Sequence, residues 1–548
     1  MSATLYCHTL RHLKPIQFYG RVWFRLYRPK PDDRPAPSLR KCIGDWQVPP
    51  AHAASMLTPS RFCFLNLEQE LREPSDWNHP EWEKLWLYNL HYFDDLMRVD
   101  WRDWHEPHVA LIQRWIGENS PGIGNGWEPY PLSLRIVNWI KWMIAGAIPP
   151  PSIFDSLAMQ IRYLRRRLEM HLLGNHLFSN AKALVFAGVF FVGEEADAWL
   201  RKGIALLRKE IKEQILVDGA HFELSPMYHS IILEDVLDLI NLGRTYPSII
   251  PDDFLDDLRI AERRMRQWLT HLTHPDGDIA FFNDATFGIA ASPAALDVYA
   301  MRLGGEIISA SPEGLTLLPQ SGYVRLQREN VTLLFDTARV GPDHLPGHAH
   351  ADTLSFELSW GDQRVLCNSG TSCYGTGIQR HWERSTAAHN TVVIAATDSS
   401  EIWAGFRVAR RAYPMDLASG ERNGILFVSA AHDGYRRLPG QPIHWREVRV
   451  GNGVVTWTDR ISSEQGHSIV GYLPLHPDII LEASQPSRWL LSLPNGERLE
   501  LRRENGLPLH LEEGWYASEF GKLQRRSVLI WRTEDRLNVE ERFSIRQE

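Results

Sequence analysis

Asparagine, histidine, tyrosine and carboxylate side chains gather in four short segments of this chain. In the first, residues 174–181 read GNHLFSNA, so Asn175 and His176 directly precede an apolar stretch. Asparagine often caps the first turn of a helix. This pair is therefore interpreted with equal weight as a structural cap or as part of a functional site. In the second, residues 218–229 read DGAHFELSPMYH, with two histidines, a glutamate and a tyrosine between two helical patterns. So many titratable groups in one short stretch indicate proton transfer.

The third and fourth segments are rich in histidine. Residues 346–356 read PGHAHADTLSF. If this stretch is extended, His348, His350 and Asp352 point to one face, because the side chains of a strand alternate. Three such groups on one face favour a proton-transfer or metal site over a chance surface strand. His389 lies in the fourth segment, and together with His350 it could complete a zinc site.

The elements before about residue 315 have helical periodicity. Between Leu132 and Trp142, apolar side chains surround a stripe formed by Arg135, Asn138 and Lys141. Several stretches are strongly apolar, as expected of helices that pack on both sides in a layered array. The predicted helices span residues 85–97, 105–118, 153–172, 176–192, 195–216, 230–243 and 253–273.

After about residue 315 the pattern changes to period two. The stretches 323–327 and 331–335 flank the turn signal REN, and 447–450 and 454–457 flank GNG, so each pair predicts a hairpin. Short alternating stretches continue to the end of the chain. Regularly spaced short strands with turn signals predict an antiparallel β-sandwich. The expected architecture is therefore multidomain, with helices first and strands second.

Composition excludes several classes of protein. The chain has 548 residues and a formal net charge of −8, with 44% hydrophobic and 23% charged residues. A collagen-like or largely disordered chain is excluded, and the acidic balance argues against a nucleic-acid partner. No apolar run reaches the roughly 18 residues that a membrane span needs. Five cysteines are no disulfide framework, and 21 tryptophans, whose rings can stack on sugars, favour a carbohydrate ligand modestly.

The first 27 residues are basic but have neither the apolar core nor the cleavage site of a secretory signal. This pattern predicts a cytoplasmic protein, or a periplasmic one if the N-terminus was trimmed. The sequence leaves the oligomeric state open.

Several motifs resemble the heparinase II/III family of polysaccharide lyases. The likeness runs from about residue 80 to at least residue 395, in the family's order and with similar spacing. It implies an incomplete (α/α) toroid followed by an antiparallel β-sandwich, with an N-terminal lead-in at 1–75, a toroid lyase domain at 76–314 and a heparinase II/III-like β-domain at 315–548. The motifs are WLYNLHYF at 86–93, WEPYP at 127–131, GNHL at 174–177, FELSPMYH at 222–229 and GHAHAD at 347–352.

The chemistry that this resemblance implies is β-elimination at a uronic acid, which leaves a 4,5-unsaturated end. Such an enzyme needs a partner for the carboxylate, a base for the C5 proton and an acid for the O4 leaving group. By resemblance, Asn175 binds the carboxylate and Tyr228 is the general acid. Tyr228 is also the base when both groups lie on one face of the ring, and His348 is the base when the proton lies opposite.

The same comparison indicates residues that bind the substrate, an anionic uronate-containing polysaccharide or oligosaccharide. A free tyrosine has a pKa of about 10, so Tyr228 would need a cationic neighbour to act as a base. His229, His176 and Arg135 are the candidates. The predicted substrate-binding residues are His176, Glu223, His229, Arg135 and Trp127.

A cofactor is not required for this reaction, but the resemblance allows a structural zinc ion. Family members that hold zinc in the β-domain tend to use two histidines and one aspartate. His350 and His389 match the histidines, whereas Asn368 stands where an aspartate is expected. Asparagine is a poor zinc ligand, which puts the metal in doubt.

Two other functions compete with the lyase. One is a non-catalytic or editing polysaccharide-binding protein of bacterial exopolysaccharide or surface-polysaccharide synthesis. It would be indicated by loss of Asn175, Tyr228 or His348, and all of these are present. The other is a hydrolase built on two carboxylates, for which Glu223 and Asp352 could serve. The clustering of histidine and tyrosine favours elimination.

Overall fold

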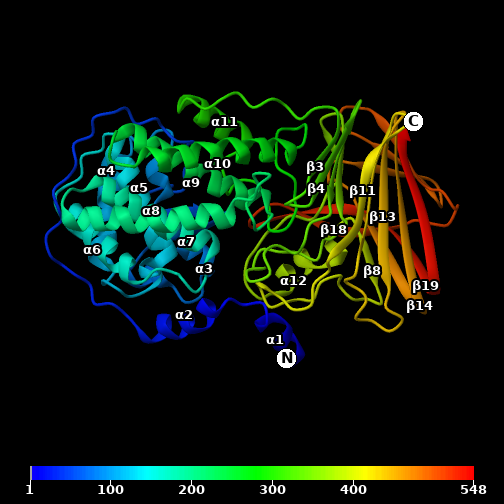
Figure 1. Cartoon of the computed structure of the whole chain (residues 1–548), viewed down its shortest axis with the longest axis horizontal. Coiled ribbons are helices and arrows are strands. Elements are labelled where there is room, and N and C mark those ends of the chain that lie inside the picture. Colours follow the sequence, from blue (N-terminus) through cyan, green and yellow to red (C-terminus); the bar gives the residue numbers. More distant parts are fainter. Residues whose placement is uncertain (1–2) are drawn as a thin grey trace.

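The computed structural model describes residues 3–548 and divides them into a helical part and a β part, which lie side by side along the long axis of the molecule (Figure 1). Most helices agree with the periodicity to within about four residues, but α3 and α6 end earlier than predicted, at Tyr92 and Arg166, and α11 was not predicted. The last of them ends at Arg302, and the first strand of the β part begins at Gly314. The helices are α3 (Lys84–Tyr92), α4 (His105–Glu118), α5 (Pro129–Ile144), α6 (Ser152–Arg166), α7 (Gly174–Phe190), α8 (Glu194–Gln214), α9 (Pro226–Thr245), α10 (Asp252–His271) and α11 (Pro293–Arg302).

Local sequence explains where these helices begin. Ser225 caps α9 by accepting a hydrogen bond from the backbone N–H of Tyr228, and Pro226 occupies the first turn, where no N–H is needed. In α8 the first turn carries Glu194, Glu195 and Asp197, whose charges favour the positive end of the helix dipole. These signals fix the starts of helices whose interiors are held by packing.

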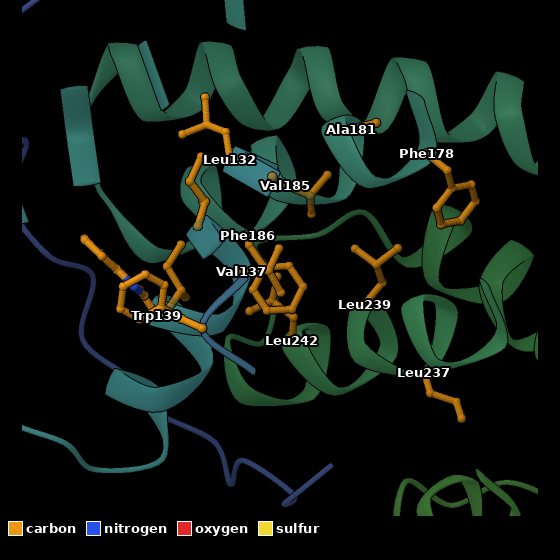
Figure 2. Packing of buried hydrophobic residues seen from close by; sticks show 14 of the residues in the cluster. Leu132, Val137, Trp139, Phe178, Ala181, Val185, Phe186, Leu237, Leu239 and Leu242 are labelled. Atoms are coloured by element: carbon orange, nitrogen blue, oxygen red, sulfur yellow. The ribbon is translucent and has the colours of Figure 1, made fainter. Parts of the chain in front are cut away.

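The core of the helical part forms where α5, α7 and α9 meet. Figure 2 shows Leu132, Val137 and Trp139 of α5 beside Phe186 of α7 and Leu242 of α9. Nearly every residue of α7 is buried, so this helix is covered on all sides. A helix in that position has no solvent face, and its polar residues must therefore find partners inside the protein.

The β part consists of two antiparallel sheets packed face to face. One has five strands in the order β3-β4-β5-β6-β7, and the other has ten, with β14 (Val454–Pro474) and β19 (Lys522–Gln547) as its long central pair. Phe356 of the small sheet packs on Trp457 of the large one at a ring distance of 5.5 Å, in a core to which both sheets contribute. Both predicted hairpins are present, as β4–β5 and β13–β14.

The remaining strands complete these sheets and two small hairpins. Their bounds are β1 (Arg61–Phe64), β2 (Leu67–Glu70), β3 (Gly314–Leu318), β4 (Tyr323–Arg328), β5 (Val331–Asp336), β6 (Phe356–Trp360), β7 (Gln363–Leu366), β8 (Val392–Ile394), β9 (Ile402–Trp403), β10 (Arg407–Val408), β11 (Pro414–Arg422), β12 (Ile425–His432), β13 (Ile443–Gly451), β15 (Ile480–Gln485), β16 (Arg488–Ser492), β17 (Arg498–Arg503) and β18 (His510–Glu519).

Short helices complete the fold. The lead-in contains α1 (Ala3–Leu10) and α2 (Pro15–Leu26), which lie along one edge of the molecule (Figure 1). Within the β part, α12 (Ile378–Arg384) extends for only about two turns. Among residues 3–548, no helix combines the length and apolarity needed to cross a bilayer.

Candidate active site

Tyr228 stands in the first turn of α9, at the end of the helical part that faces the β part. Its ring packs on the imidazole of His348 with the ring centroids 3.9 Å apart. Burial is the main cause that raises the pKa of Tyr228 well above its usual value, and the nearby Tyr374 hydroxyl raises it further. The hydroxyl is therefore protonated at neutral pH, which suits a general acid.

His348 comes from a loop of the β part. The stretch is not extended, because residues 346–355 form turns and irregular backbone rather than a strand, so the condition for His348, His350 and Asp352 to share one face is not met. His348 nevertheless faces the helical part: its Nδ1 lies 2.8 Å from Asp284 Oδ2 and its Nε2 lies 3.6 Å from Glu223 Oε2. Because a carboxylate can only accept, the proton belongs on Nδ1. That tautomer leaves the Nε2 lone pair free to take a proton.

Asp284 is the centre of the charged cluster behind His348. Its carboxylate also accepts from His350 Nε2 at 2.8 Å and from both terminal nitrogens of Arg380, including Nη2 at 2.7 Å. Burial opposes ionisation, but Arg380 and the two histidines hold the pKa of Asp284 well below its usual value. The carboxylate is therefore charged and fixes the orientation of His348.

The backbone of Asp284 joins the two parts of the fold. Ser225 Oγ donates to its carbonyl oxygen at 2.5 Å, and its own N–H donates to the carbonyl of His348 at 2.9 Å. Ser225 is also the residue that caps the helix of Tyr228. One residue thus connects the cap below Tyr228 with both the backbone and the imidazole of His348.

Asn175 and Glu223 lie together at the start of α7, and neither side chain makes a hydrogen bond within the described chain, although Glu223 lies 3.6 Å from His348 Nε2. Asn175 is 4% exposed, and the hydrogen bonds among residues 3–548 include none from its side-chain amide. Glu223 is 3% exposed and neither of its carboxyl oxygens has a hydrogen-bond partner within the described chain. A methyl group placed on Gly174 would lie 2.8 Å from Glu223 Oε1, so the start of α7 packs on this carboxyl. Burial raises the pKa of Glu223.

His176 lies one residue further along α7. Its Nδ1 is 3.1 Å from Glu169 Oε1, and its ring packs on Tyr130 with 4.4 Å between the centroids. Burial disfavours the charged ring, but the Glu169 carboxylate outweighs it and raises the pKa of His176. His176 is therefore a half-buried cation candidate next to Asn175 in sequence, and its role in binding the substrate stays a prediction.

Tyr374 is a site residue that the motifs did not reveal. Its hydroxyl lies 2.8 Å from that of Tyr228, and its ring centroid is 5.8 Å from that of His348. It follows β7 in a loop that is unremarkable in sequence. The sequence does not mark Asp284 or Arg380 either. Asp284 stands in an Asn-Asp pair, which is an ordinary turn signal, and Arg380 lies in a short polar helix.

The prediction that Arg135 receives an anionic chain is wrong. Arg135 is completely buried in the helical core, where it donates to Gln160 Oε1, to the carbonyl of His91 and to the carbonyl of Gly126. Its guanidinium also stacks on Trp115 at 3.8 Å. The stripe on α5 was a true periodicity, but packing in the helical core leaves none of it in solvent.

Trp127 and His229 are also core residues and not substrate contacts. Trp127 is 3% exposed and packs on Tyr163 with 5.2 Å between the ring centroids. His229 is fully buried, accepts from the backbone N–H of His221 and contacts the carbonyl of Met265 through Nε2 at 2.9 Å. Burial lowers the pKa of His229 to about 3, so it supplies no cation to Tyr228.

The two histidines suggested for zinc face each other. His350 Nδ1 lies 3.1 Å from His389 Nε2, while Asp284 holds His350 Nε2 and the carbonyl of Ser385 holds His389 Nδ1, as outer partners do for metal-bound histidines. Asn368, which stands where an aspartate is expected, accepts from the backbone of Asn390. Across residues 3–548 no group of three or more His, Cys, Asp or Glu is placed to hold a metal ion. The described residues therefore supply two facing histidines and no third ligand, and the structural zinc ion stays a prediction from the sequence.

Two models of one protein family match the sequence of this chain. Residues 153–296 match the family model described as "Heparinase II/III N-terminus", and residues 310–545 match "Heparinase II/III-like, C-terminal". Together the two ranges cover most of the chain, including the segments that carry Asn175, Tyr228 and His348.

Curated relatives are distant. A "Heparin-sulfate lyase" of Bacteroides stercoris is 23% identical over 430 residues, which cover 73% of this chain and 61% of that protein. "FtsZ-localized protein C" of Caulobacter vibrioides is 26% identical over 368 residues, which cover 64% of this chain and 60% of that protein. The chain therefore spans about three fifths of the length of these relatives.

Among solved structures, one described as "Crystal Structure of Heparinase III" aligns with a TM-score of 0.72 and 18% identity, over 98% of this chain and 92% of that one. At this identity the likeness is one of fold. It confirms the predicted class, an incomplete (α/α) toroid followed by an antiparallel β-sandwich. With both family models matched in order along that fold, the chain belongs to the heparinase II/III-like family.

Proposed function

We propose that the protein is a polysaccharide lyase that cleaves uronic-acid-containing polysaccharides or oligosaccharides by β-elimination. The observation that carries the proposal is the pairing of Tyr228 with His348. A protonated tyrosine from the helical part and an imidazole with a free Nε2 from the β part lie in ring contact. An acid and a base at one point are what elimination requires.

The unpartnered Asn175 supports the same reaction. A carboxylate beside C5 resists loss of the C5 proton, because the intermediate carries a second negative charge. A preorganised amide that hydrogen-bonds this carboxylate stabilises the developing charge. Asn175 has such an amide with no partner among residues 3–548. The name of the Bacteroides stercoris relative, a heparin-sulfate lyase, supports a glycosaminoglycan or similar uronate polymer as the substrate class.

The proposed reaction proceeds as follows. His348 Nε2 takes the C5 proton when that proton lies opposite the leaving group, and the electrons of the C5–H bond move into the carboxylate as an enolate. They then form the C4=C5 double bond while the C4–O4 bond breaks. Tyr228 gives its hydroxyl proton to O4. The tyrosinate that remains is neutralised by the proton on His348, whose ring it contacts, so the site returns to its starting state.

When the C5 proton and O4 lie on one face, the proposal assigns both transfers to Tyr228. This requires a cation near the hydroxyl, because burial raises its pKa. The structure offers His348 in ring contact with Tyr228, and His176 is the other histidine of the site. Arg135 and His229, which are buried elsewhere, have no part in this proposal.

The test is a panel of uronate polysaccharides incubated with the purified chain. A 4,5-unsaturated uronate absorbs in the ultraviolet, so product formation is followed by absorbance. At least one polymer should give this product, and the His348→Ala variant should lose most activity on substrates whose C5 proton lies opposite O4. Reducing ends that accumulate without absorbance would indicate hydrolysis and contradict the proposal.

A further inference from the structure

The outer face of α2 is apolar and exposed. Phe18, Tyr19, Val22, Trp23 and Leu26 are 47%, 62%, 59%, 62% and 79% exposed. Their spacing of i, i+1, i+4, i+5 and i+8 places them on one stripe of the helix. Scattered apolar residues are common on protein surfaces, but five on one stripe of a twelve-residue helix form a contiguous patch that marks an interaction site.

The inner face fixes α2 to the protein. Gln17, the buried residue of the helix, donates from Nε2 to the carbonyl of His344 at 3.0 Å. Phe24 packs on His171 with 4.3 Å between the ring centroids, and the Arg167 guanidinium lies 3.9 Å from the Phe24 ring. The exposed stripe is therefore presented on an anchored helix, with its orientation already set.

The charge around the stripe is strongly positive. Six Lys and Arg and no Asp or Glu precede Asp32, in a chain whose net charge is −8. Arg25 and Arg28 are exposed, and neither is in an ion pair within the described chain. Cations of the toroid continue this surface. They line a cavity of about 310 Å³ beside Tyr19 and Trp23 and, among the described residues, three of them are exposed without a carboxylate partner: Arg165, Arg166 and Lys202.

We propose that α2 docks the protein onto the surface of a bilayer that contains anionic phospholipid. A helix with aromatic and aliphatic residues on one stripe and arginine beside it suits the boundary between headgroups and acyl chains. The uncompensated cations attract anionic headgroups. A soluble acidic polymer would satisfy these cations and could stack on Tyr19 and Trp23, but it offers no apolar volume in which to bury Val22 and Leu26. The stripe therefore favours a membrane.

This attachment is peripheral and independent of the proposed lyase activity. It depends on residues that lie outside the cluster of Tyr228, His348 and Asn175. Gln17, however, donates to the carbonyl of His344. The docking helix therefore contacts the loop that carries His348, the proposed base.

The test is sedimentation of the full chain with vesicles. One set contains phosphatidylcholine alone, and the other contains phosphatidylcholine mixed with phosphatidylglycerol. The protein should sediment with the mixed vesicles, and added salt should weaken the binding. The double variant Val22→Asp/Leu26→Asp should reduce binding more than tenfold, because it removes apolar area and adds charge of the wrong sign.

A matched control separates the stripe from general effects of charge. Val298→Asp/Ile307→Asp also adds two carboxylates at exposed apolar positions, one on α11 and one five residues after it. In Figure 1, α11 lies at the edge opposite α2. This variant should bind the mixed vesicles nearly as well as the parent. Circular dichroism and thermal melting should be unchanged in both variants, since all four positions are exposed.

Four outcomes would overturn the proposal. The parent chain could fail to sediment with the mixed vesicles, or the α2 variant could sediment as well as the parent. A parent chain that binds dextran sulfate through Val22 and Leu26 but ignores vesicles would assign the stripe to an acidic polymer. A parent that is dimeric in solution, ignores vesicles and becomes monomeric in the α2 variant would assign it to a second copy of the chain.

Discussion

Two buried clusters of charge in this molecule differ in what they leave unpaired. In the helical core, Lys182 of α7 contacts Asp235 and Asp238 of α9 through Nζ at 2.5 and 2.6 Å, and Lys141 contacts Asp238 as well. At the junction of the two parts, Asp284 is bound by two histidines and Arg380, but Glu223 beside it has no hydrogen-bond partner in the described chain.

We infer from this difference that the first cluster serves folding and that the second serves the proposed reaction. The lysines of the helical core are surrounded by carboxylates of their own chain, where each of the two aspartates is bound by a lysine and only Asp235 Oδ2 lacks a hydrogen-bond partner within the described residues. The cluster at the junction fixes one imidazole and leaves unpartnered groups beside it. Unpaired buried polar groups cost stability, so a carboxyl group with both oxygens unpaired beside the Tyr228–His348 pair indicates a ligand that pairs it.

The largest expected effect comes from Tyr228→Phe, which removes only the proton carrier. Turnover should fall about 10²–10⁴-fold, the usual range for general acid–base catalysis. Unfolding in urea should shift little, because the lost hydrogen bond to Tyr374 contributes about 1 kcal/mol. Tyr472→Phe, on β14 and away from the site, is the matched control. Full lyase activity in the Tyr228 variant would remove Tyr228 from the mechanism.

Lys182→Met tests the other side of the comparison. It leaves Asp235 and Asp238 buried with one ammonium fewer, and breaking a buried ion pair costs about 3–5 kcal/mol of unfolding free energy. Urea denaturation measures this loss. Activity per folded molecule should be retained. Lys209→Met, an exposed position on α8, should leave both quantities unchanged. If Lys182→Met lowered turnover without lowering stability, the cluster of the helical core would also serve the reaction, and the distinction between the two clusters would be wrong.

Asn175→Ala and Asn180→Ala sharpen the comparison within one helix. Asn175 has an unpartnered amide, so its loss should lower kcat by about 10²–10³-fold, as for other groups that stabilise developing charge, without destabilising the fold. Asn180 accepts from the backbone of Glu169 and donates to Ser133, so its loss should cost about 1–3 kcal/mol of stability. Thermal melts and initial rates on the same samples distinguish the two. Equal effects of both substitutions would contradict the assignment.

The smallest effect is the pH dependence that Glu223 adds to stability. Burial raises the pKa of Glu223 in the folded protein, whereas the unfolded value is about 4.3. Between these values the folded state holds a proton that the unfolded state has lost, so stability falls as pH rises above about 4.3. Glu223→Gln should remove this contribution and make the variant relatively more stable at neutral pH than at pH 4. Urea midpoints at both pH values provide the measurement. If the parent and the variant had the same pH dependence of stability, the pKa of Glu223 would not be raised in the folded protein.

Periodicity predicted most of the fold because it is a local property. The helix predicted at 105–118 has the bounds of α4, and the turn signals at 328–330 and 451–453 lie in real hairpins. The lead-in was harder to predict, since α1 and α2 are short and are held by contacts with distant segments such as His344 and His171.

The site was predicted only where a motif marks it. Tyr228 and His348 lie in recognisable motifs, and the structure brings them together. Arg135 was misassigned, because the polar stripe of an amphipathic helix normally faces solvent, whereas α5 is packed inside the helical core. Asp284 and Arg380 could not be predicted, because they are 96 residues apart and meet only through tertiary structure.

The bridging role of Asp284 has a mechanical consequence. Ser225, Asp284 and His348 are tied in series by hydrogen bonds of 2.5 and 2.9 Å. These two hydrogen bonds link the cap of the Tyr228 helix to the backbone of His348, so movement of one part of the fold is coupled to movement of the other. For the proposed lyase, we therefore expect the spacing between the Tyr228 hydroxyl and the His348 ring to be set before the substrate binds.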